Sequence, residues 1–521
     1  NIEVLTSEEI SQLIEIPPKP EMGDFAFPCF RLAKSYHKAP PMIAQDLKES
    51  IGDQAFLSEI KVVGGYLNFY VDKAQYAQQI IDKYKNTTDY GCSDQGKDKT
   101  ICIDYSSPNV AKNFHVGHLR TTIIGNSLYK IFSKLGYKVV RINHLGDWGT
   151  QFGKLIVAYK KWGSREAVEE KGIEELMDIY VKFHEEAEKD DSLNDEARAW
   201  FLKMEQGDEE ALEIWQWFRD ISLKEFMRVY NILGMEFDSF AGESFYRDKT
   251  ADVIKRLTDD GLLKESQGAM IVPLDEYDMP PCIVAKKDGS SIYATRDLAA
   301  ILYRKATYNF DRCLYVTGLE QKLHFAQVFK VIELMGNDYA KNLVHIPYGL
   351  VSLKSGKISS RKGNVIFAED LLRESINKTT SIIEEKNPDI PDKEEVAKQV
   401  GIGAIIFNDL YNQRIKDVIF DWNKLLNFDG ETGPYVQYTY ARASSVLRKI
   451  GEVPDTIDYT LLTDEASIGL LKEIERYPQV IKDAAERYEP SVIARYSIDL
   501  AHAFNKFYHE CQINVEDETT K

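Results

Sequence analysis

The sequence has little that would suit a membrane. A membrane-spanning helix needs about 20 consecutive apolar residues, and no apolar run in the 521 residues approaches that length. A signal-peptide pattern, internal repeats and low-complexity tracts are also lacking. The length predicts about three or four domains. We therefore expect a globular, cytoplasmic protein without membrane contact.

Cysteine is scarce, and its spacing excludes the common zinc motifs. The six cysteines form no Cys-x-x-Cys pair and no other zinc-ligand spacing. They stand at positions 29, 92, 102, 282, 313 and 511, mostly within apolar runs. Buried free thiols explain this pattern best, because free cysteine behaves as a small apolar residue. We expect a reducing compartment, no structural zinc and no other metal site.

Positive charge is also in short supply. Lys and Arg number 65 against 83 Asp and Glu, which gives a formal net charge of −18 at pH 7. A strongly acidic chain is not the usual footprint of a nucleic-acid-binding protein. Net charge constrains solubility more than it constrains one local basic patch. We therefore count it as mild evidence against RNA binding.

The pattern along the chain predicts three parts. Residues 1–98 indicate a small α+β domain followed by a polar linker. Residues 99–385 alternate strands with helices, which is typical of an α/β, Rossmann-like parallel sheet, and about 161–235 indicate a helical insertion. Residues 386–521 are helical. The chain starts at Asn1 and little follows its last predicted helix, so the sequence leaves open whether native termini are missing.

The segment His-Val-Gly-His at 115–118 lies where a predicted strand hands over to a predicted helix. The strand is Thr100–Tyr105, and the helix runs from Leu119 to Leu135 before Gly136. Backbone N–H groups at a helix N-terminus attract anions, glycine lets a flat ring approach, and imidazoles donate to phosphate oxygens. The segment therefore suits a triphosphate. Taken alone, two histidines three residues apart on a helix are more often a core or surface pair, or half of a metal site.

A second segment, from Leu353 to Val365, gathers positive charge. Its sequence Leu-Lys-Ser-Gly-Lys-Ile-Ser-Ser-Arg-Lys-Gly-Asn-Val offers four cations, three hydroxyls and two glycines. Such a loop suits a mobile lid on a triphosphate, because ammonium groups stabilise developing charge and glycines allow hinges. A solvated basic loop is the alternative. The segment lacks the glycine spacing of a P-loop, so it does not support a Walker-type enzyme.

Together these two segments resemble the signatures of the class I aminoacyl-tRNA synthetase family. The longer motifs around them resemble its arginine branch, the arginyl-tRNA synthetases, across nearly the whole chain. These motifs are Ser106–Arg120, Gly146–Gly153, Tyr293–Asp297 and Tyr435–Arg442. The resemblance implies a Rossmann-like catalytic domain, an N-terminal domain that contacts tRNA and an all-α anticodon-binding domain. Whether this last domain is complete at its C-terminus stays open. It also implies ATP with Mg²⁺, L-arginine and tRNA(Arg) as reactants, and activation that waits for tRNA.

The resemblance implies a set of residues around ATP. His115 and His118 should donate to the phosphates, Gly117 should lie under the adenine, and Lys357 should reach the pyrophosphate end. The remaining ATP-binding residues implied are Gly318, Glu320, His324 and Ser359. Glu320 would take the ribose hydroxyls. For Gly318, Glu320 and His324, a strand followed by a helix cap is the plain alternative.

The segment Leu353–Val365, which we call the lysine loop, departs from the class pattern at one position. A second lysine is expected at position 360, where Ser360 stands. The arginine branch commonly pairs this loss with a lysine just before the histidine segment, and Lys112 fits that place. We expect Lys112 to supply the missing charge. Lys362 is the second candidate, and a plain surface lysine at 112 is the alternative.

A guanidinium ligand calls for carboxylates in bidentate geometry. The resemblance implies a pocket of Asp104, Asn109, Tyr293, Asp297 and Gln321. Family members often carry glutamate where Asp104 stands, and the shorter side chain leaves its direct contact with the guanidinium open. Such a pocket leaves its carboxylates unpaired with other amino acids, so binding alone discriminates. We expect no editing domain.

The tRNA-binding residues that the resemblance implies lie near both ends of the chain. They are Asn68, Phe69, Tyr411, Arg414 and Tyr435. Aromatic side chains stack on unpaired bases, although aromatics on helices more often pack in a core. We expect a monomeric enzyme. A catalytically inactive paralogue that binds tRNA or senses arginine is the rival, against which intact His115, His118 and Lys357 argue.

Overall fold

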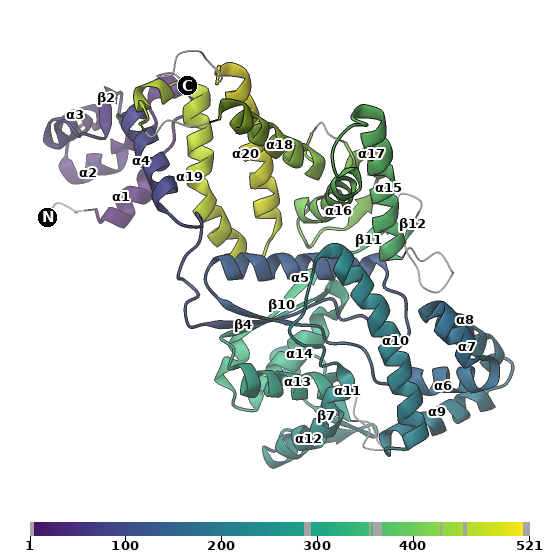
Figure 1. Ribbon diagram of the computed structural model, residues 1–521. Helices are drawn as coiled ribbons and strands as arrows, with labels where there is room; N and C mark the ends of the chain where they lie inside the picture. The colour runs from purple at the N-terminus through teal and green to yellow at the C-terminus, as the bar shows by residue number, and fades with distance from the viewer. Residues whose placement is uncertain are drawn as a thin grey trace. The chain divides into compact units, whose positions relative to one another are not determined.

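The computed structural model describes residues 5–285, 293–353, 356–357, 367–427, 430–451 and 456–513. The chain forms two compact units, which we treat separately (Figure 1). The first unit comprises Asn1–Tyr90, Thr439–Pro478 and Asp499–Lys521, and the second comprises Gly91–Tyr438 and Gln479–Ile498. Across the described residues, no helix combines the length and the apolar character that a bilayer crossing requires.

A four-stranded parallel sheet forms the centre of the second unit. Its strand order is β10-β9-β4-β5. The strands are β4 (Thr100–Asp104), β5 (Lys138–Ile142), β9 (Arg312–Gly318) and β10 (Leu343–Tyr348). Strand β4 is central and buried from Ile101 onwards, because a parallel sheet is covered on both faces. Helix α5 (Val116–Lys134) makes the crossover from β4 to β5. The predicted parallel sheet is confirmed.

Five helices follow β5, and the last four of them lie within the predicted insertion of about 161–235. They are α6 (Thr150–Trp162), α7 (Arg165–Lys171), α8 (Ile173–Ala187), α9 (Ser192–Glu205) and α10 (Glu209–Leu233). Helices α6 to α9 gather beside the long helix α10 (Figure 1). Their apolar faces meet in one core that includes Phe152, Phe183 and Phe218, all buried. Trp215 and Trp217 of α10 also pack against this core.

The rest of the second unit carries further helices and two small sheets. Helices α11 (Glu243–Tyr246), α12 (Thr250–Asp259), α13 (Tyr293–Tyr308) and α14 (Lys322–Leu334) surround the central sheet and the antiparallel sheet β6 (Lys264–Ser266), β7 (Ala269–Val272), β8 (Cys282–Ala285). Next come β11 (Val351–Leu353), β12 (Gly356–Lys357), α15 (Ala368–Lys386), α16 (Lys393–Tyr411), β13 (Val418–Phe420) and α17 (Trp422–Leu425). Strand β11 pairs with β12 and with β13.

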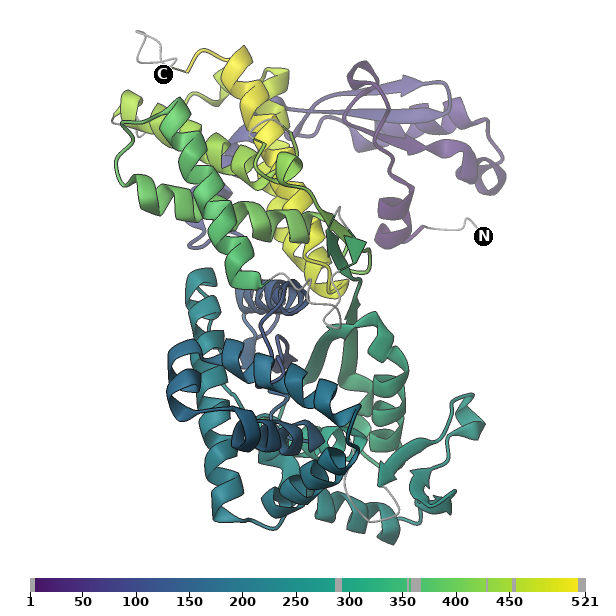
Figure 2. The same cartoon turned by 90° about the vertical axis from the view of Figure 1, so that its right-hand side faces the viewer.

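The first unit contains a small antiparallel sheet, whose strands β2 and β3 lie side by side in Figure 2. The strand order is β1-β3-β2, with β1 (Phe25–Pro28), β2 (Leu57–Val63) and β3 (Tyr66–Val71). The neighbouring helices are α1 (Ser7–Leu13), α2 (Ala33–Tyr36), α3 (Pro40–Ile51) and α4 (Lys73–Asn86). The C-terminal helices of the chain are α18 (Gly433–Ile450), α19 (Glu465–Glu486) and α20 (Ser491–Glu510). The predicted α+β start and helical end are confirmed.

Candidate active site

The two histidines of the first signature occupy the N-terminus of α5. His115 is the N-cap residue, and its Nδ1 accepts a hydrogen bond from the Gly117 backbone N–H at 3.0 Å. His118 Nδ1 accepts from the His115 backbone N–H at 3.3 Å. The rings stack with their centroids 3.9 Å apart. Because each Nδ1 is an acceptor, the ring proton of each neutral imidazole sits on Nε2. Both side chains therefore keep one N–H available for an anion.

Burial keeps this pair neutral. It lowers the pKa of His118 well below its usual value, with smaller contributions from the nearby His115 and Lys112. Burial and then the Lys112 charge lower the pKa of His115 in the same way. Lys112 is itself exposed in the turn before α5. The ammonium of Lys112 therefore lies close enough to act on both imidazoles, which the sequence alone could not establish.

The turn between β4 and α5 holds an unusual backbone. Ser106, Ser107 and Ala111 have positive φ values of 72°, 46° and 58°. This region is uncommon for residues other than glycine and costs free energy unless surrounding contacts compensate. The Thr121 hydroxyl accepts from the Ser106 N–H at 3.3 Å, and the Ser222 hydroxyl accepts from the Ala111 N–H at 2.9 Å. Strain of this kind clusters at functional sites.

The far end of the lysine loop is tied to the histidine signature. Phe367 forms an antiparallel bridge with His115, and the Ala368 N–H donates to the Phe114 carbonyl at 2.8 Å. At its near end, the Lys357 backbone in β12 pairs with Ser352 of β11. The side chain of Lys357, together with Ser359, Ser360 and Lys362, lies outside the described residues.

Asp104 is the last residue of β4, and its carboxylate has an internal partner. Asp104 Oδ2 lies 2.7 Å from Nη2 of the buried Arg304, which α13 supplies. Arg304 Nη2 also lies 3.2 Å from His144 Nδ1, and Asp104 Oδ1 accepts from the Ser107 hydroxyl at 2.9 Å. The Asp104 carboxylate therefore already forms an ion pair with a guanidinium of the chain itself.

Asp297, predicted to bind arginine, forms a hydrogen bond with His324, which was predicted to bind ATP. Its Oδ2 lies 2.6 Å from His324 Nε2, which joins the first helical turns of α13 and α14. Burial alone would lower the pKa of His324, but the hydrogen bond and charge of Asp297 raise it above its usual value. Tyr293 begins α13 and is 61% exposed. Its ring centroid lies 5.6 Å from the Arg296 guanidinium carbon.

Gly318, Glu320 and Gln321 stand at the carboxyl end of β9. Ligands of doubly wound sheets bind at this edge. A Cβ at Gly318 would lie 2.2 Å from Glu320 Oε1, so glycine leaves room for the carboxylate in its present position. Glu320 and Gln321 are both exposed. The two side chains are thus accessible to a ligand at this edge.

Asn109 rests on the loop that follows β5. It forms a parallel bridge with Gly146, and a Cβ at Gly146 would lie 2.1 Å from Asn109 Oδ1. The Asn109 side chain is exposed. The predicted pocket residues thus come from the end of β4 and the turn after it, from the turn after β9 and from the start of α13. In the part of the chain that the structure describes, no group of three or more His, Cys, Asp or Glu side chains could hold a metal ion.

Three family models match the chain in sequence order. Residues 2–71 match the arginyl tRNA synthetase N terminal domain, and residues 79–422 match the catalytic domain of class I (R) tRNA synthetases. Residues 436–521 match the DALR anticodon binding domain. The chain belongs to the arginyl-tRNA synthetase family. The resemblance proposed from the sequence is confirmed.

Relatives and solved structures of the arginyl-tRNA synthetase family agree with this assignment. The arginine–tRNA ligase of Clostridioides difficile (strain 630) is 57% identical over 518 residues, covering 99% of this chain and 92% of the relative. That of Halothermothrix orenii is 52% identical over 519 residues, with the same coverage of 99% and 92%. The structure of Thermus thermophilus arginyl-tRNA synthetase superposes with a TM-score of 0.78 at 25% identity, covering 96% of this chain and 88% of that one.

The residues predicted to contact tRNA are largely engaged within the protein. The Asn68 side chain is 2% exposed in β3, and Phe69 packs against the core of the N-terminal domain. Arg414 donates to the carbonyls of Tyr488 at 2.9 Å and Pro347 at 2.6 Å. Tyr411 stacks on Phe407 and lies under the Arg495 guanidinium, and Tyr435 is half-buried in α18. Their contact with tRNA stays a prediction.

Sequence reasoning missed several residues that shape this site of the arginyl-tRNA synthetase family. Arg304 is buried and His144 is half-buried beside Asp104, and Glu243 pairs with Arg296 at 2.5 Å. One signal was available for Arg304, because an arginine within the apolar stretch of a helix needs a buried partner. No sequence pattern identifies that partner as Asp104, which lies on another element.

Proposed function

We propose that this chain is an active arginine–tRNA ligase. It activates L-arginine with ATP to arginyl-adenylate, releasing pyrophosphate, and transfers the arginyl group to the 3′-terminal adenosine of tRNA(Arg), releasing AMP. The observation that carries the proposal is the pair His115 and His118 at the N-terminus of α5. Both are neutral, with Nδ1 capped by a backbone N–H and Nε2–H available to phosphate oxygens.

In the activation step, the arginine carboxylate attacks the α-phosphorus of ATP and pyrophosphate leaves. Charge builds on phosphate oxygens, so positioned donors lower the barrier. His115 and His118 donate from Nε2, aided by the N-terminal dipole of α5. Lys112, whose charge acts on both histidines, supplies the positive charge missing at Ser360, together with Lys357. Gly117 lies under the adenine.

The sheet edge after β9 completes the ATP site. Glu320 accepts from the ribose hydroxyls, next to Gly318, whose lack of a side chain leaves space for that carboxylate. His324 and Ser359 contact the nucleotide. Mg²⁺ enters with ATP, because it retains several waters and binds phosphate oxygens readily.

Arginine lies between Asn109 and the start of α13. Asp297 and Tyr293 face its guanidinium, while Asn109 and Gln321 hold the groups around its α-carbon. Asp104 adds to the negative charge of the pocket. Because Arg304 already pairs with Asp104, we expect Asp297 to contribute the larger part of the attraction.

A charging assay tests the proposal. The purified chain is incubated with ATP, Mg²⁺, total tRNA and each amino acid in turn, and aminoacyl-tRNA is measured. We expect arginine alone to be attached, and pyrophosphate exchange to be negligible until tRNA is added. Attachment of another amino acid contradicts the specificity. Absence of any charging favours the inactive paralogue that binds tRNA or senses arginine.

The proposal extends to the state of the protein in the cell. We propose a monomer that works in the cytoplasm and binds tRNA(Arg) through its terminal parts, with Asn68, Phe69, Tyr411, Arg414 and Tyr435 as the candidate contacts. Sedimentation of the active enzyme, alone and with tRNA, tests the monomer. A dimer at the concentrations used for catalysis contradicts it.

A further inference from the structure

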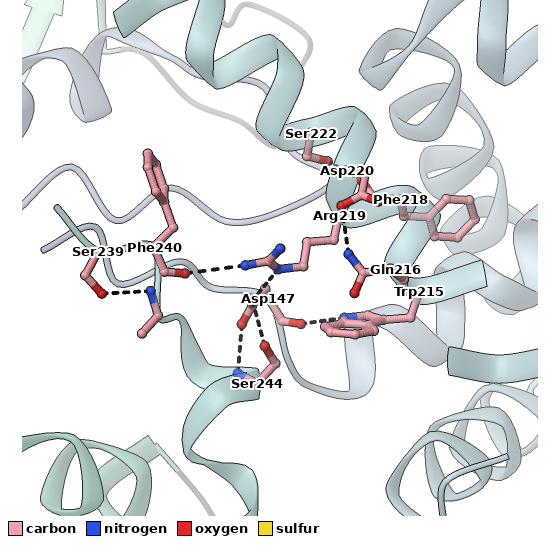
Figure 3. Close-up of polar contacts among 11 residues, drawn as sticks. Asp147, Trp215, Gln216, Phe218, Arg219, Asp220, Ser222, Ser239, Phe240 and Ser244 are labelled. Carbon is pink, nitrogen blue, oxygen red and sulfur yellow. Dashed lines mark hydrogen bonds and ion pairs between the residues drawn. The ribbon is translucent and has the colours of Figure 1, made fainter. Parts of the chain in front are cut away.

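The motif Gly146–Gly153 contains a fully buried carboxylate to which the proposed function gives no role. Asp147 is 0% exposed. Its Oδ2 accepts from Arg219 Nε at 2.9 Å and from the Ser244 hydroxyl at 2.8 Å, and its Oδ1 accepts from the Ser244 backbone N–H at 2.8 Å (Figure 3). The Asp147 carbonyl accepts from the Trp215 indole N–H at 2.7 Å. A buried charge is stable only with such partners.

This carboxylate joins three segments that are distant in the sequence. Asp147 belongs to the loop after β5, Trp215 and Arg219 belong to the insertion helix α10, and Ser244 belongs to α11. Arg219 also donates to the Phe240 carbonyl at 3.4 Å. Figure 3 shows the Arg219 guanidinium between the Asp147 carboxylate and the Phe240 carbonyl. The contact therefore fixes how these three segments lie against one another.

On one side, the Asp147 loop supports Asn109. Gly146 precedes Asp147, its N–H donates to the Pro108 carbonyl at 3.1 Å, and its carbonyl accepts from the Val110 N–H at 3.0 Å. These two bonds bracket Asn109. Because a Cβ at Gly146 would meet Asn109 Oδ1 at 2.1 Å, the two residues are in tight contact. A displacement of the Asp147 loop therefore moves Asn109.

On the other side, the same contact supports the start of α13. Glu243 precedes Ser244, and its N–H donates to the Leu145 carbonyl at 2.9 Å. The Glu243 side chain pairs with Arg296 Nη1 at 2.5 Å. Arg296 is adjacent to Asp297 and lies over the Tyr293 ring. Both halves of the proposed arginine pocket thus depend on segments that Asp147 holds together.

One face of α10 extends this support to the turn before α5. Besides Trp215 and Arg219, Ser222 accepts from Ala111 N–H, and the Tyr230 hydroxyl lies 2.7 Å from Ser106 Oγ. These positions recur at helical spacing, so they share one face. The positive φ values at Ser106 and Ala111 need such external contacts.

We propose that Asp147 and Arg219 are positioning residues for arginine, through which the insertion helix α10 sets the affinity of the pocket for its amino acid. The inference rests on the proposed function. Neither residue needs to touch a substrate. Their contact fixes the Asn109 turn and, through Ser244 and Glu243, the segment facing Asp297. The residues proposed to contact ATP, on α5 and after β9, depend less on the contact between Asp147 and Arg219 than the arginine pocket does.

Steady-state charging kinetics with tRNA present test this inference. The variants are Asp147→Asn, Arg219→Gln and the pair combined, with Arg219→Lys and Ser244→Ala as milder changes. We expect KM for arginine to rise about tenfold or more, because small displacements of positioning groups are costly, while KM for ATP stays within about twofold. Because the two residues share one contact, we expect the combined variant to resemble the worse single variant. Arg219→Lys should recover part of the loss.

Arg165→Gln is the matched control, since Arg165 forms an exposed ion pair with Glu169 on α7 of the same insertion. It should leave both KM values unchanged. Equal rises in the two KM values, additive effects, or folded variants with wild-type KM for arginine overturn the inference. If Asp147→Asn does not fold by circular dichroism, Arg219→Lys and Ser244→Ala decide by the same comparison. A wild-type chain that charges no arginine overturns the proposed function, whereas an active wild type with unaffected variants overturns only this inference.

Discussion

His324 Nε2 lies 2.6 Å from Asp297 Oδ2. The sequence suggested one residue for ATP and the other for arginine, and the structure makes them partners. The substrate guanidinium therefore competes with His324 for Asp297 whenever the imidazole is protonated.

The affinity for arginine should depend on pH through His324. Asp297 raises the pKa of His324, so the protonated pair is complete at low pH and is lost as the pH rises through that pKa. Above it, Asp297 is free to pair with arginine. We expect KM for arginine to fall as the pH increases from about 6 to about 9. His324→Gln should remove this pH-dependent step in KM. The measurement is KM for arginine as a function of pH in the charging reaction. An unchanged step in that variant would point to a different titrating group.

Removal of the Lys112 ammonium should slow activation. Lys112 acts electrostatically on both His115 and His118, and loss of one such charge typically costs about 10²–10³ in rate. We expect Lys112→Ala to lower the tRNA-dependent pyrophosphate exchange rate by that factor. Lys130→Ala, an exposed change on α5, is the control. A rate within a few-fold of wild type contradicts the role of Lys112 as the replacement charge. A large loss of rate in Lys362→Ala would instead assign that role to Lys362.

The signature histidines should contribute both a donor and a helix cap. His115→Ala removes the Nε2–H and the acceptor for Gly117 N–H. We expect kcat to fall about 10²–10³-fold and the free energy of unfolding to fall by about 1 kcal/mol, with KM for arginine little changed. His115→Asn restores a capping acceptor without the donor at Nε2. It should therefore recover stability but not kcat. Equal recovery of both properties would contradict the two roles.

Glu243 should make stability depend on pH. Burial raises the pKa of Glu243 to about 8, outweighing the attraction of Arg296. A raised pKa means that the folded state binds more protons than the unfolded chain, so the associated stability is present at low pH and is lost as the pH rises towards about 8. We expect the free energy of unfolding to decrease between about pH 5 and about pH 8, and Glu243→Gln to flatten that slope. Urea unfolding at several pH values measures it. Parallel slopes in the two proteins would rule Glu243 out as the source.

Much of the fold could be read from local patterns. The helix expected from Leu119 to Leu135 corresponds to α5, and the helical part expected after residue 386 contains α16, α18, α19 and α20. Such elements follow from periodicity and end signals within a few residues. Net charge was a poorer guide. The value of −18 counted against RNA binding, yet residues 436–521 match an anticodon-binding domain, because global charge does not constrain a local surface.

The sequence by itself determined the family, because several motifs along the chain resemble that family together. It also determined the histidine pair, because the pair lies within four consecutive residues at one helix start. The tertiary structure decided which partners the pocket carboxylates take. Asp104 pairs with Arg304, Asp297 with His324 and Asp147 with Arg219, each on a different element. Local propensity carries no information about such pairs, because they form only when packing removes both groups from water and each charge must find a partner.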